Sequence, residues 1–180
     1  ILACTGIGIA LGSYVAGRVS KNYIDTGLLP MGALGIALGL GVLTFLHSFS
    51  AFALVFFLVG FCGGLFTVPL NALIQFNAKS EELGRTLAAN NWVQNVVMLS
   101  FLGLTFVFSL LNLSSKTLLQ LIAWVALIGC CYTVWQLPQS FMRAALGYIL
   151  TRRYKIAVQG IKNIPPQGGV LMLGNHVSWI

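Results

Sequence analysis

Charged residues are scarce in this sequence. Only 7% of its 180 residues are Asp, Glu, Lys or Arg, whereas 58% are hydrophobic, and the mean hydropathy is +0.91. Soluble domains carry about 25% charged residues. This composition therefore excludes an ordinary water-soluble domain, and most side chains are expected to face lipid or other helices.

Carboxylates are rarer still, and cysteines show no pattern. The three acidic residues are Asp25, Glu81 and Glu82, and none lies within an apolar run. A proton relay built from buried carboxylates is therefore excluded. The four cysteines have no C-x-x-C spacing and no neighbouring His, which predicts free thiols in apolar surroundings rather than a disulfide framework or a metal site.

Five apolar runs are predicted to be long enough to cross a bilayer, which takes about 20 residues. The first starts at Ile1 without an initiator Met or a basic flank, so we expect a helix cut within its span, not a signal peptide, in a fragment of a larger membrane protein. An all-α polytopic bundle is predicted over residues 1–137. Its spans are predicted at residues 2–16, 28–46, 51–73, 88–111 and 118–137.

The formal charge of +7 is distributed unevenly between the two sides of the predicted bundle. If the spans alternate, nine of the ten basic residues fall on the side of the loop at residues 18–26, and Lys116 alone falls on the other. This asymmetry predicts that the loop and the C-terminal part are cytoplasmic. It favours membrane lipids as partners, with anionic headgroups near Arg152 and Arg153, and no nucleic acid.

Glycines recur at helical spacing in the first two runs. Gly8 and Gly12, and likewise Gly35 and Gly39, form pairs of small residues four apart. Such pairs let helix backbones approach closely in lipid. They predict a packed bundle rather than a single-pass anchor.

Side-chain amides gather in the third and fourth runs. Several lie four residues apart, and amides in hydrocarbon are costly unless they are hydrogen-bonded, so they should face the bundle interior or a water-filled cavity. Two roles remain open: links between helices, or a substrate path or gate. Arg85 likewise could pair with Glu81 or contact a partner helix in a gate, and Ser80 is the expected helix cap. The amides are Asn71, Gln75, Asn90, Asn91, Gln94 and Asn95.

Two segments carry a family resemblance. Residues 60–75 (GFCGGLFTVPLNALIQ) and 82–91 (ELGRTLAANN) resemble the bacterial lysophospholipid transporter branch of the major facilitator superfamily. The resemblance implies helices eight to twelve of a twelve-helix fold in the bacterial inner membrane, with the N-terminal helices as missing partners. Gly12 and Arg18 suit the superfamily's loop signature, which implies a gating role for Arg18, but Ala16 stands where an Asp is usual.

The composition changes after residue 137. Residues 138–153 are predicted to form an interfacial linker helix with apolar and basic faces. Residues 154–180 are predicted to begin a cytoplasmic α/β domain, because residues 154–159 alternate as in a half-buried strand. A turn at residues 165–169 then precedes a short apolar strand at residues 170–173.

That strand leads to Asn175-His176-Val177-Ser178, which resembles the start of the Asn-His-x-Ser-x-x-Asp signature of glycerolipid acyltransferases. The resemblance implies that His176 is the general base on a lysophospholipid hydroxyl, with Asn175 and Ser178 binding substrate. An acyl thioester of coenzyme A or acyl carrier protein would be the co-substrate, with no bound cofactor or metal. The Asp would follow Ile180, so this fragment alone is expected to have little or no acyltransferase activity.

The two resemblances together predict part of a bifunctional protein that moves lysophospholipid across the membrane and reacylates it. Two alternatives stay open. The helices could belong to a major facilitator transporter of another solute, such as a drug or a sugar. Alternatively, the protein could be an acyltransferase for which the helices serve only as an anchor.

Overall fold

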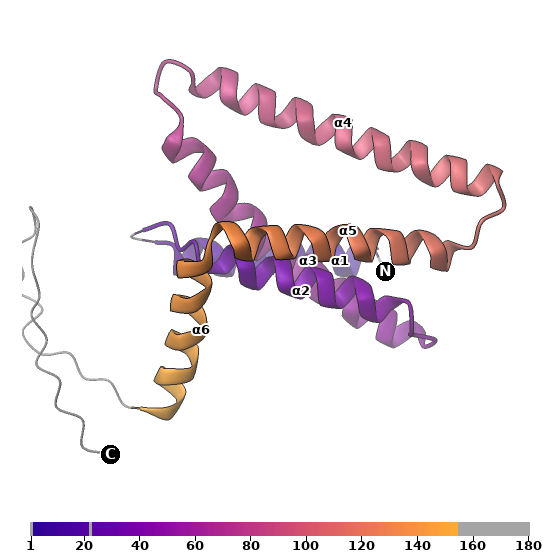
Figure 1. Cartoon of the computed structure of the whole chain (residues 1–180), viewed down its shortest axis with the longest axis horizontal. Helices are drawn as coiled ribbons and strands as arrows, with labels where there is room; N and C mark the ends of the chain where they lie inside the picture. The colour runs from indigo at the N-terminus through magenta and orange to yellow at the C-terminus, as the bar shows by residue number, and fades with distance from the viewer. Residues whose placement is uncertain (1, 22, 155–180) are drawn as a thin grey trace, which may run out of the picture. The chain divides into compact units, whose positions relative to one another are not determined.

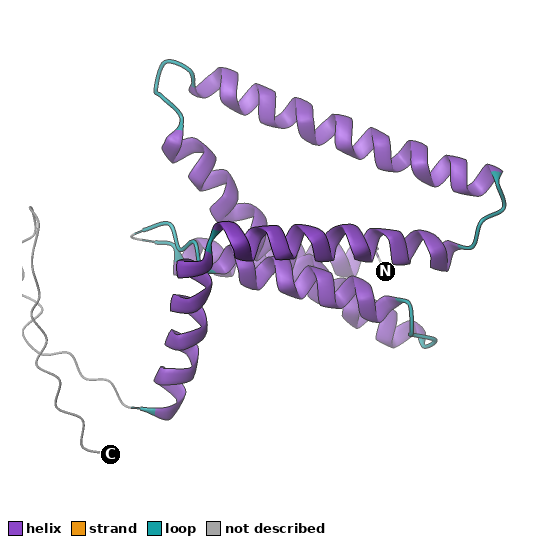
Figure 2. Ribbon diagram, viewed as in Figure 1, coloured by secondary structure: helices purple, strands orange, loops and turns teal. Residues whose placement is uncertain are grey.

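The computed structural model describes residues 2–21 and 23–154, and this part of the chain contains six helices and no strand (Figure 1; Figure 2). The chain divides into two units, residues 1–145 and 146–180. The predicted α/β domain at residues 154–180 lies outside the described residues except for Tyr154. The helices are α1 (Leu2–Val19), α2 (Leu28–Leu43), α3 (Phe49–Asn77), α4 (Leu83–Leu110), α5 (Ser115–Gln136) and α6 (Pro138–Arg153).

Among the described residues, α1, α3, α4 and α5 are long and apolar enough to cross a membrane, and α2 is a shorter apolar helix, so the predicted span at residues 28–46 stays a prediction. α2 has 16 residues and ends at Leu43, not at residue 46. At about 1.5 Å per residue it rises about 24 Å, less than the roughly 30 Å of a bilayer core. The helix ends there because the chain tightens: the Phe45 N–H donates to the Val42 carbonyl, and the Thr44 hydroxyl donates to the Gly41 carbonyl.

Glycines hold α1 against α3, as the sequence predicted. A Cβ atom at Gly8 would collide with the backbone carbonyl of Phe57, and one at Gly12 with that of Phe61. The contact is reciprocal, because a Cβ at Gly60 would meet the carbonyl of Thr5. Backbone therefore touches backbone along this interface, a packing that only glycine permits in lipid.

α2 lies between α3 and α5 and forms the small core of the bundle. On the α3 side, a Cβ atom at Gly35 would collide with the Sγ atom of Cys62. On the α5 side, Ala33 and Ala37 are buried with Cys130. Small side chains on both faces of α2 therefore bring three helices together.

α4 differs from its neighbours because none of its residues is buried. Its end is well defined nonetheless: Asn112 adopts a positive φ of 53°. The N–H of Leu113 donates to the Phe108 carbonyl, and the N–H of Asn112 donates to the Ser109 carbonyl. This pair of bonds is the Schellman arrangement, in which asparagine tolerates the left-handed conformation.

Candidate membrane transport site

The amides singled out in the sequence lie at one end of the hairpin formed by α3 and α4. Asn71 and Gln75 are in the last two turns of α3, and residues 78–82 connect α3 to α4. Asn90, Asn91, Gln94 and Asn95 follow within the first four turns of α4. Because the hairpin reverses the chain, both groups lie toward the connecting loop (Figure 1).

These amides are placed together but are not linked to one another across the hairpin. Asn71 and Asn90 are half-buried, whereas Gln75, Asn91, Gln94 and Asn95 are exposed. The Asn95 Nδ2 donates to the backbone carbonyl of Asn91 at 2.9 Å, within α4. No side-chain hydrogen bond joins the amides of α3 to those of α4 in the described part of the chain. The structure therefore does not show them as links between helices, and their role in a path stays a prediction.

Arg18 lies at the end of α1 that leads into α2. Its Nη1 donates to the Tyr14 hydroxyl at 3.2 Å, one helical turn back. The two side chains line a shallow hollow of about 560 Å³ together with Ser13, Gly17 and Lys21. Two cations beside hydroxyl groups can attract and hydrogen-bond a phosphate or another anion.

Arg85 is exposed in the first turn of α4 and does not have the predicted neighbours. The helix begins at Leu83 with Glu82 at the capping position, so the prediction of Ser80 as the cap was wrong. The reason is a separate turn before the helix, closed by the Glu82 N–H donating to the Lys79 carbonyl. Among the described residues Arg85 forms no salt bridge with Glu81. The predicted pairing with Glu81 is therefore not observed, and a role of Arg85 in a gate stays a prediction.

A contact at this end of the bundle was missed at the sequence level. Arg143, in the first half of α6, reaches Asp25 in the loop after α1, with 3.4 Å between Nη2 and Oδ1. The same carboxylate accepts the N–H of Gly27 at 3.0 Å, and the hydroxyls of Thr26 and Ser140 are 2.6 Å apart. The feature of the sequence that could have indicated this ion pair is Asp25, because it is the one carboxylate in a loop that otherwise carries basic residues. Its partner is 118 positions away, beyond the reach of local patterns.

The side chains at this end can bind polar and anionic groups. The cysteines are free, as predicted, with Cys130 buried and Cys131 exposed. The described residues contain no group of His, Cys, Asp and Glu able to hold a metal ion. The predicted acyltransferase residues Asn175, His176 and Ser178 lie outside the described residues.

Comparison with known families settles the class of the bundle. The sequence profile of the Major Facilitator Superfamily matches residues 1–102, which is more than half of the chain. The chain belongs to the major facilitator superfamily. The resemblance seen in the sequence is confirmed at this level, and α1, α2 and α3 with most of α4 lie within the superfamily match.

Curated relatives narrow the comparison within the superfamily. The chain is 36% identical over 103 residues to the lysophospholipid transporter LplT of Yersinia enterocolitica, covering 57% of this chain and 25% of that protein. It is 38% identical over 106 residues to the LplT of Klebsiella pneumoniae and over 104 residues to that of Serratia proteamaculans, covering 57% of this chain and 26% of each relative. The chain thus spans about a quarter of the length of these relatives. No solved structure matches it.

Proposed function

We propose that this major facilitator chain is part of a lysophospholipid transporter. The observation that carries the proposal is the 36–38% identity to proteins named lysophospholipid transporter LplT, over more than half of the chain. The candidate site supports the same substrate class. It combines uncharged amides on α3 and α4 with cations at the end of α1.

A lysophospholipid poses a specific physical problem for transport. Its single acyl chain can stay in the apolar layer, but its phosphate headgroup must cross that layer without losing its hydrogen bonds. Amides such as Asn71 and Asn90 donate and accept hydrogen bonds without adding charge to the membrane interior. Arg18 and Lys21 would attract the phosphate to one end of the path, where the hollow beside Tyr14 lies.

Reconstitution of the full-length protein tests the transport proposal. Vesicles containing the protein should move labelled lysophospholipid between leaflets faster than protein-free vesicles. Asn71→Leu and Asn90→Leu should each slow that movement, whereas Gln136→Leu should not, since Gln136 is an exposed amide on α5 that donates to the Tyr132 hydroxyl. Movement of a drug or sugar instead of lysophospholipid would favour transport of another solute. A rate equal to that of protein-free vesicles would support an anchoring role for the helices.

We propose further that the protein reacylates the lysophospholipid it transports. The support is the sequence Asn175-His176-Val177-Ser178, which follows the bundle and resembles an acyltransferase signature. His176 would take the proton from the lysophospholipid hydroxyl as its oxygen attacks the thioester carbonyl. The carbon–sulfur bond then breaks, and the thiolate of coenzyme A or acyl carrier protein leaves with that proton, giving an ester and a free thiol.

The two activities can be separated by two substitutions. His176→Ala in the full-length protein should abolish acyl transfer from the thioester while movement of labelled lysophospholipid continues. Asn71→Leu should slow the movement of labelled lysophospholipid in vesicles, and its acyl transfer in detergent should be unchanged because that reaction needs no transport. Unchanged acyl transfer by His176→Ala would contradict the catalytic assignment.

A bacterial inner-membrane location with a cytoplasmic C-terminal part completes the proposal. The support is the excess of basic residues on one side of the bundle, nine against Lys116. A reporter enzyme that works only in the cytoplasm should be active when it is fused after Tyr154. Activity of a periplasmic reporter at the same junction would reverse the topology.

A further inference from the structure

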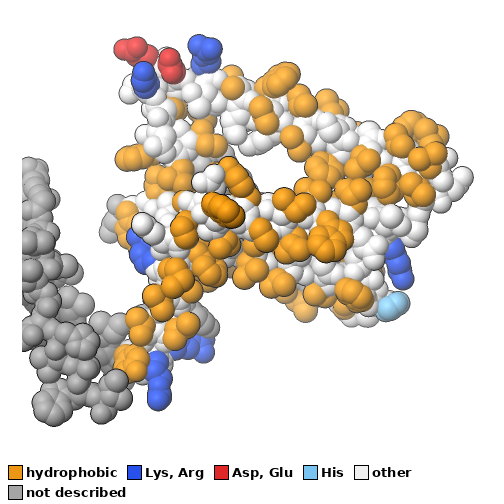
Figure 3. Space-filling view, in the orientation of Figure 1, with side chains coloured by type: hydrophobic (Ala, Val, Ile, Leu, Met, Phe, Trp, Pro, Cys, Tyr) orange, Lys and Arg blue, Asp and Glu red, His pale blue; other side chains and the backbone are white. Residues whose placement is uncertain are grey.

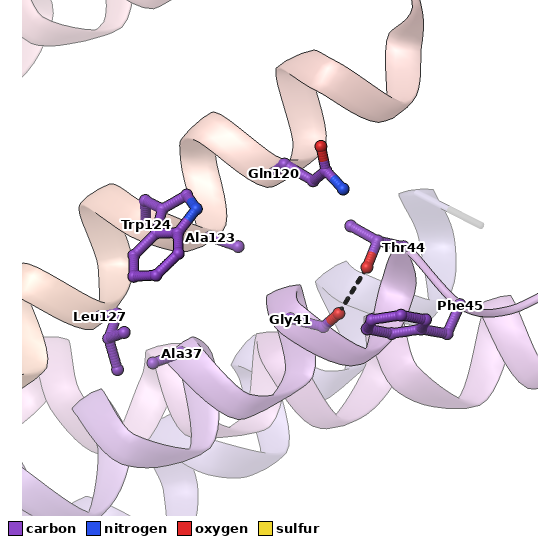
Figure 4. A pocket seen from close by; sticks show the side chains of 8 residues that line it. All are labelled: Ala37, Gly41, Thr44, Phe45, Gln120, Ala123, Trp124 and Leu127. Carbon is purple, nitrogen blue, oxygen red and sulfur yellow. Dashed lines mark hydrogen bonds between the residues drawn. The ribbon is translucent and has the colours of Figure 1, made fainter.

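A groove opens between α2 and α5 at the end of the bundle opposite the candidate transport site. The two helices touch at Ala33 and Cys130, where the core is closed. Toward the loop at residues 44–48 they enclose a hollow of about 410 Å³, lined by Ala37, Gly41, Thr44, Gln120, Ala123 and Trp124, among others (Figure 4). Hollows of about 300–1,000 Å³ are typical of small-molecule sites.

Small residues create the groove on both of its walls. A Cβ atom at Gly41 would meet nothing within 4 Å, so the α2 wall is open there. Ala123 faces it from α5, with Leu127 deeper along the same helix (Figure 4). The inner part of the groove is therefore apolar, and it is open because Gly41 and Ala123 carry no large side chain.

Polar groups mark the outer part. The Thr44 hydroxyl donates to the Gly41 carbonyl at 2.9 Å, which leaves its oxygen free to accept (Figure 4). Gln120 and Trp124 lie on the α5 wall, and neither side chain has a hydrogen-bond partner among the described residues. An amide and an indole N–H thus stand beside an apolar slot with their donors unused.

One basic residue lies one helical turn beyond the outer part of the groove. Lys116 precedes Gln120 by four residues on α5, so the two lie on the same helix face. His47 lies in the loop after α2, and a basic side chain and a histidine stand at this end of the bundle in the space-filling view (Figure 3). The carboxylates of the described part, Asp25, Glu81 and Glu82, all lie in the loops of the opposite end.

We propose that this groove binds a membrane glycerophospholipid. One acyl chain lies in the slot between Gly41 and Ala123, the ester oxygens accept hydrogen bonds from Gln120 and Trp124, and the phosphate lies against Lys116. From Lys116 to Leu127 α5 rises about 16 Å at about 1.5 Å per residue, close to half of a bilayer core of about 30 Å. An acyl chain within one leaflet has this extent.

The same features argue against a protein segment as the occupant. A helix with its side chains is about 10–12 Å across, too wide for a slot whose walls come from neighbouring, touching helices. The side chains along α5 also follow the order of a lipid, with Lys116 outermost, the amide of Gln120 next, and the apolar surface of Ala123 and Leu127 innermost. The site requires only that the bundle lies in a membrane, and it is separate from the transport site proposed above.

Native mass spectrometry of the full-length protein, titrated with palmitoyl-oleoyl phosphatidylglycerol in detergent, tests the proposal. Ala123→Phe fills the slot and should weaken the tightest lipid adduct at least tenfold. Val125→Phe is the matched control, because Val125 is exposed on the same helix at the same depth but does not line the groove. Gln120→Leu, at an exposed position that cannot disturb the fold, should weaken the adduct without changing the slot.

A separate comparison tests whether the lipid phosphate lies against Lys116. Lys116→Glu should weaken the phosphatidylglycerol adduct, and inorganic phosphate at the same concentration should give no adduct with the unaltered protein. A photoreactive acyl chain on the same lipid should cross-link within residues 120–127. The proposal is overturned if Ala123→Phe and Val125→Phe weaken binding equally, if Gln120→Leu and Lys116→Glu leave it unchanged, or if the groove cross-links to a second copy of the protein instead.

Discussion

The interface between α1 and α3 makes a quantitative prediction, because its closest approach is backbone against backbone. In Gly12→Ala, the added methyl group would collide with the carbonyl of Phe61. Overpacking costs about 1–3 kcal/mol, and backbone atoms cannot rotate aside as a side chain can. Alanine returns at most about 1 kcal/mol of helix propensity. With a cost at the upper end of that range, about 3 kcal/mol, the net loss should be about 2 kcal/mol, or roughly 30-fold in the folding equilibrium.

Gly6→Ala is the matched control on the same helix, because a Cβ atom at Gly6 meets nothing within 4 Å. It should leave stability unchanged or raise it by up to about 1 kcal/mol. Thermal unfolding of both variants of the full-length protein in detergent, followed by size-exclusion chromatography, measures the difference. If Gly12→Ala is as stable as Gly6→Ala, glycine does not hold these helices together and the described interface is wrong.

Other contacts lead to smaller effects. Gly35→Ala should cost less than about 1 kcal/mol in the same unfolding assay, because its methyl group meets the Cys62 side chain, which can change rotamer; a loss as large as that of Gly12→Ala would contradict this. Arg143→Ala should cost at most about 1 kcal/mol, since its side chain is 63% exposed. Asp25→Ala should cost about 1–2 kcal/mol, because the carboxylate also holds the N–H of Gly27; equal losses would mean that this second bond contributes nothing. A maleimide should label Cys131 at least tenfold faster than Cys130 in micelles, since Cys130 is 5% exposed, and equal rates would place both thiols on the surface.

The helices could be predicted from the sequence because apolar length and small-residue spacing are local properties. The pairs Gly8–Gly12 and Gly35–Gly39 indicated close packing, and each of these glycines does approach α3. The end of α2 could not be predicted in the same way. Leu46 continues the apolar composition, and the helix stops because Thr44 and Phe45 bond to carbonyls three residues back.

The contacts that join distant segments were beyond sequence reasoning. Asp25 was predicted in a loop and residue 143 in the interfacial helix, and only the fold places Asp25 and Arg143 3.4 Å apart. Gln120 was likewise overlooked. Its significance depends on Gly41 across the groove, and on Lys116 one turn earlier on the same face of α5. The spacing of residues within one helix shows which of them share a face, but it does not show which residues of another helix lie opposite that face.

Lysophospholipid movement by the full-length protein in sealed vesicles tests the central claim most directly. Labelled lysophospholipid in one leaflet should exchange to the other faster than in protein-free vesicles, and unlabelled lysophospholipid should compete for that movement. A rate equal to that of protein-free vesicles, in a preparation that is folded and correctly inserted, would contradict the assignment of this bundle to lysophospholipid transport.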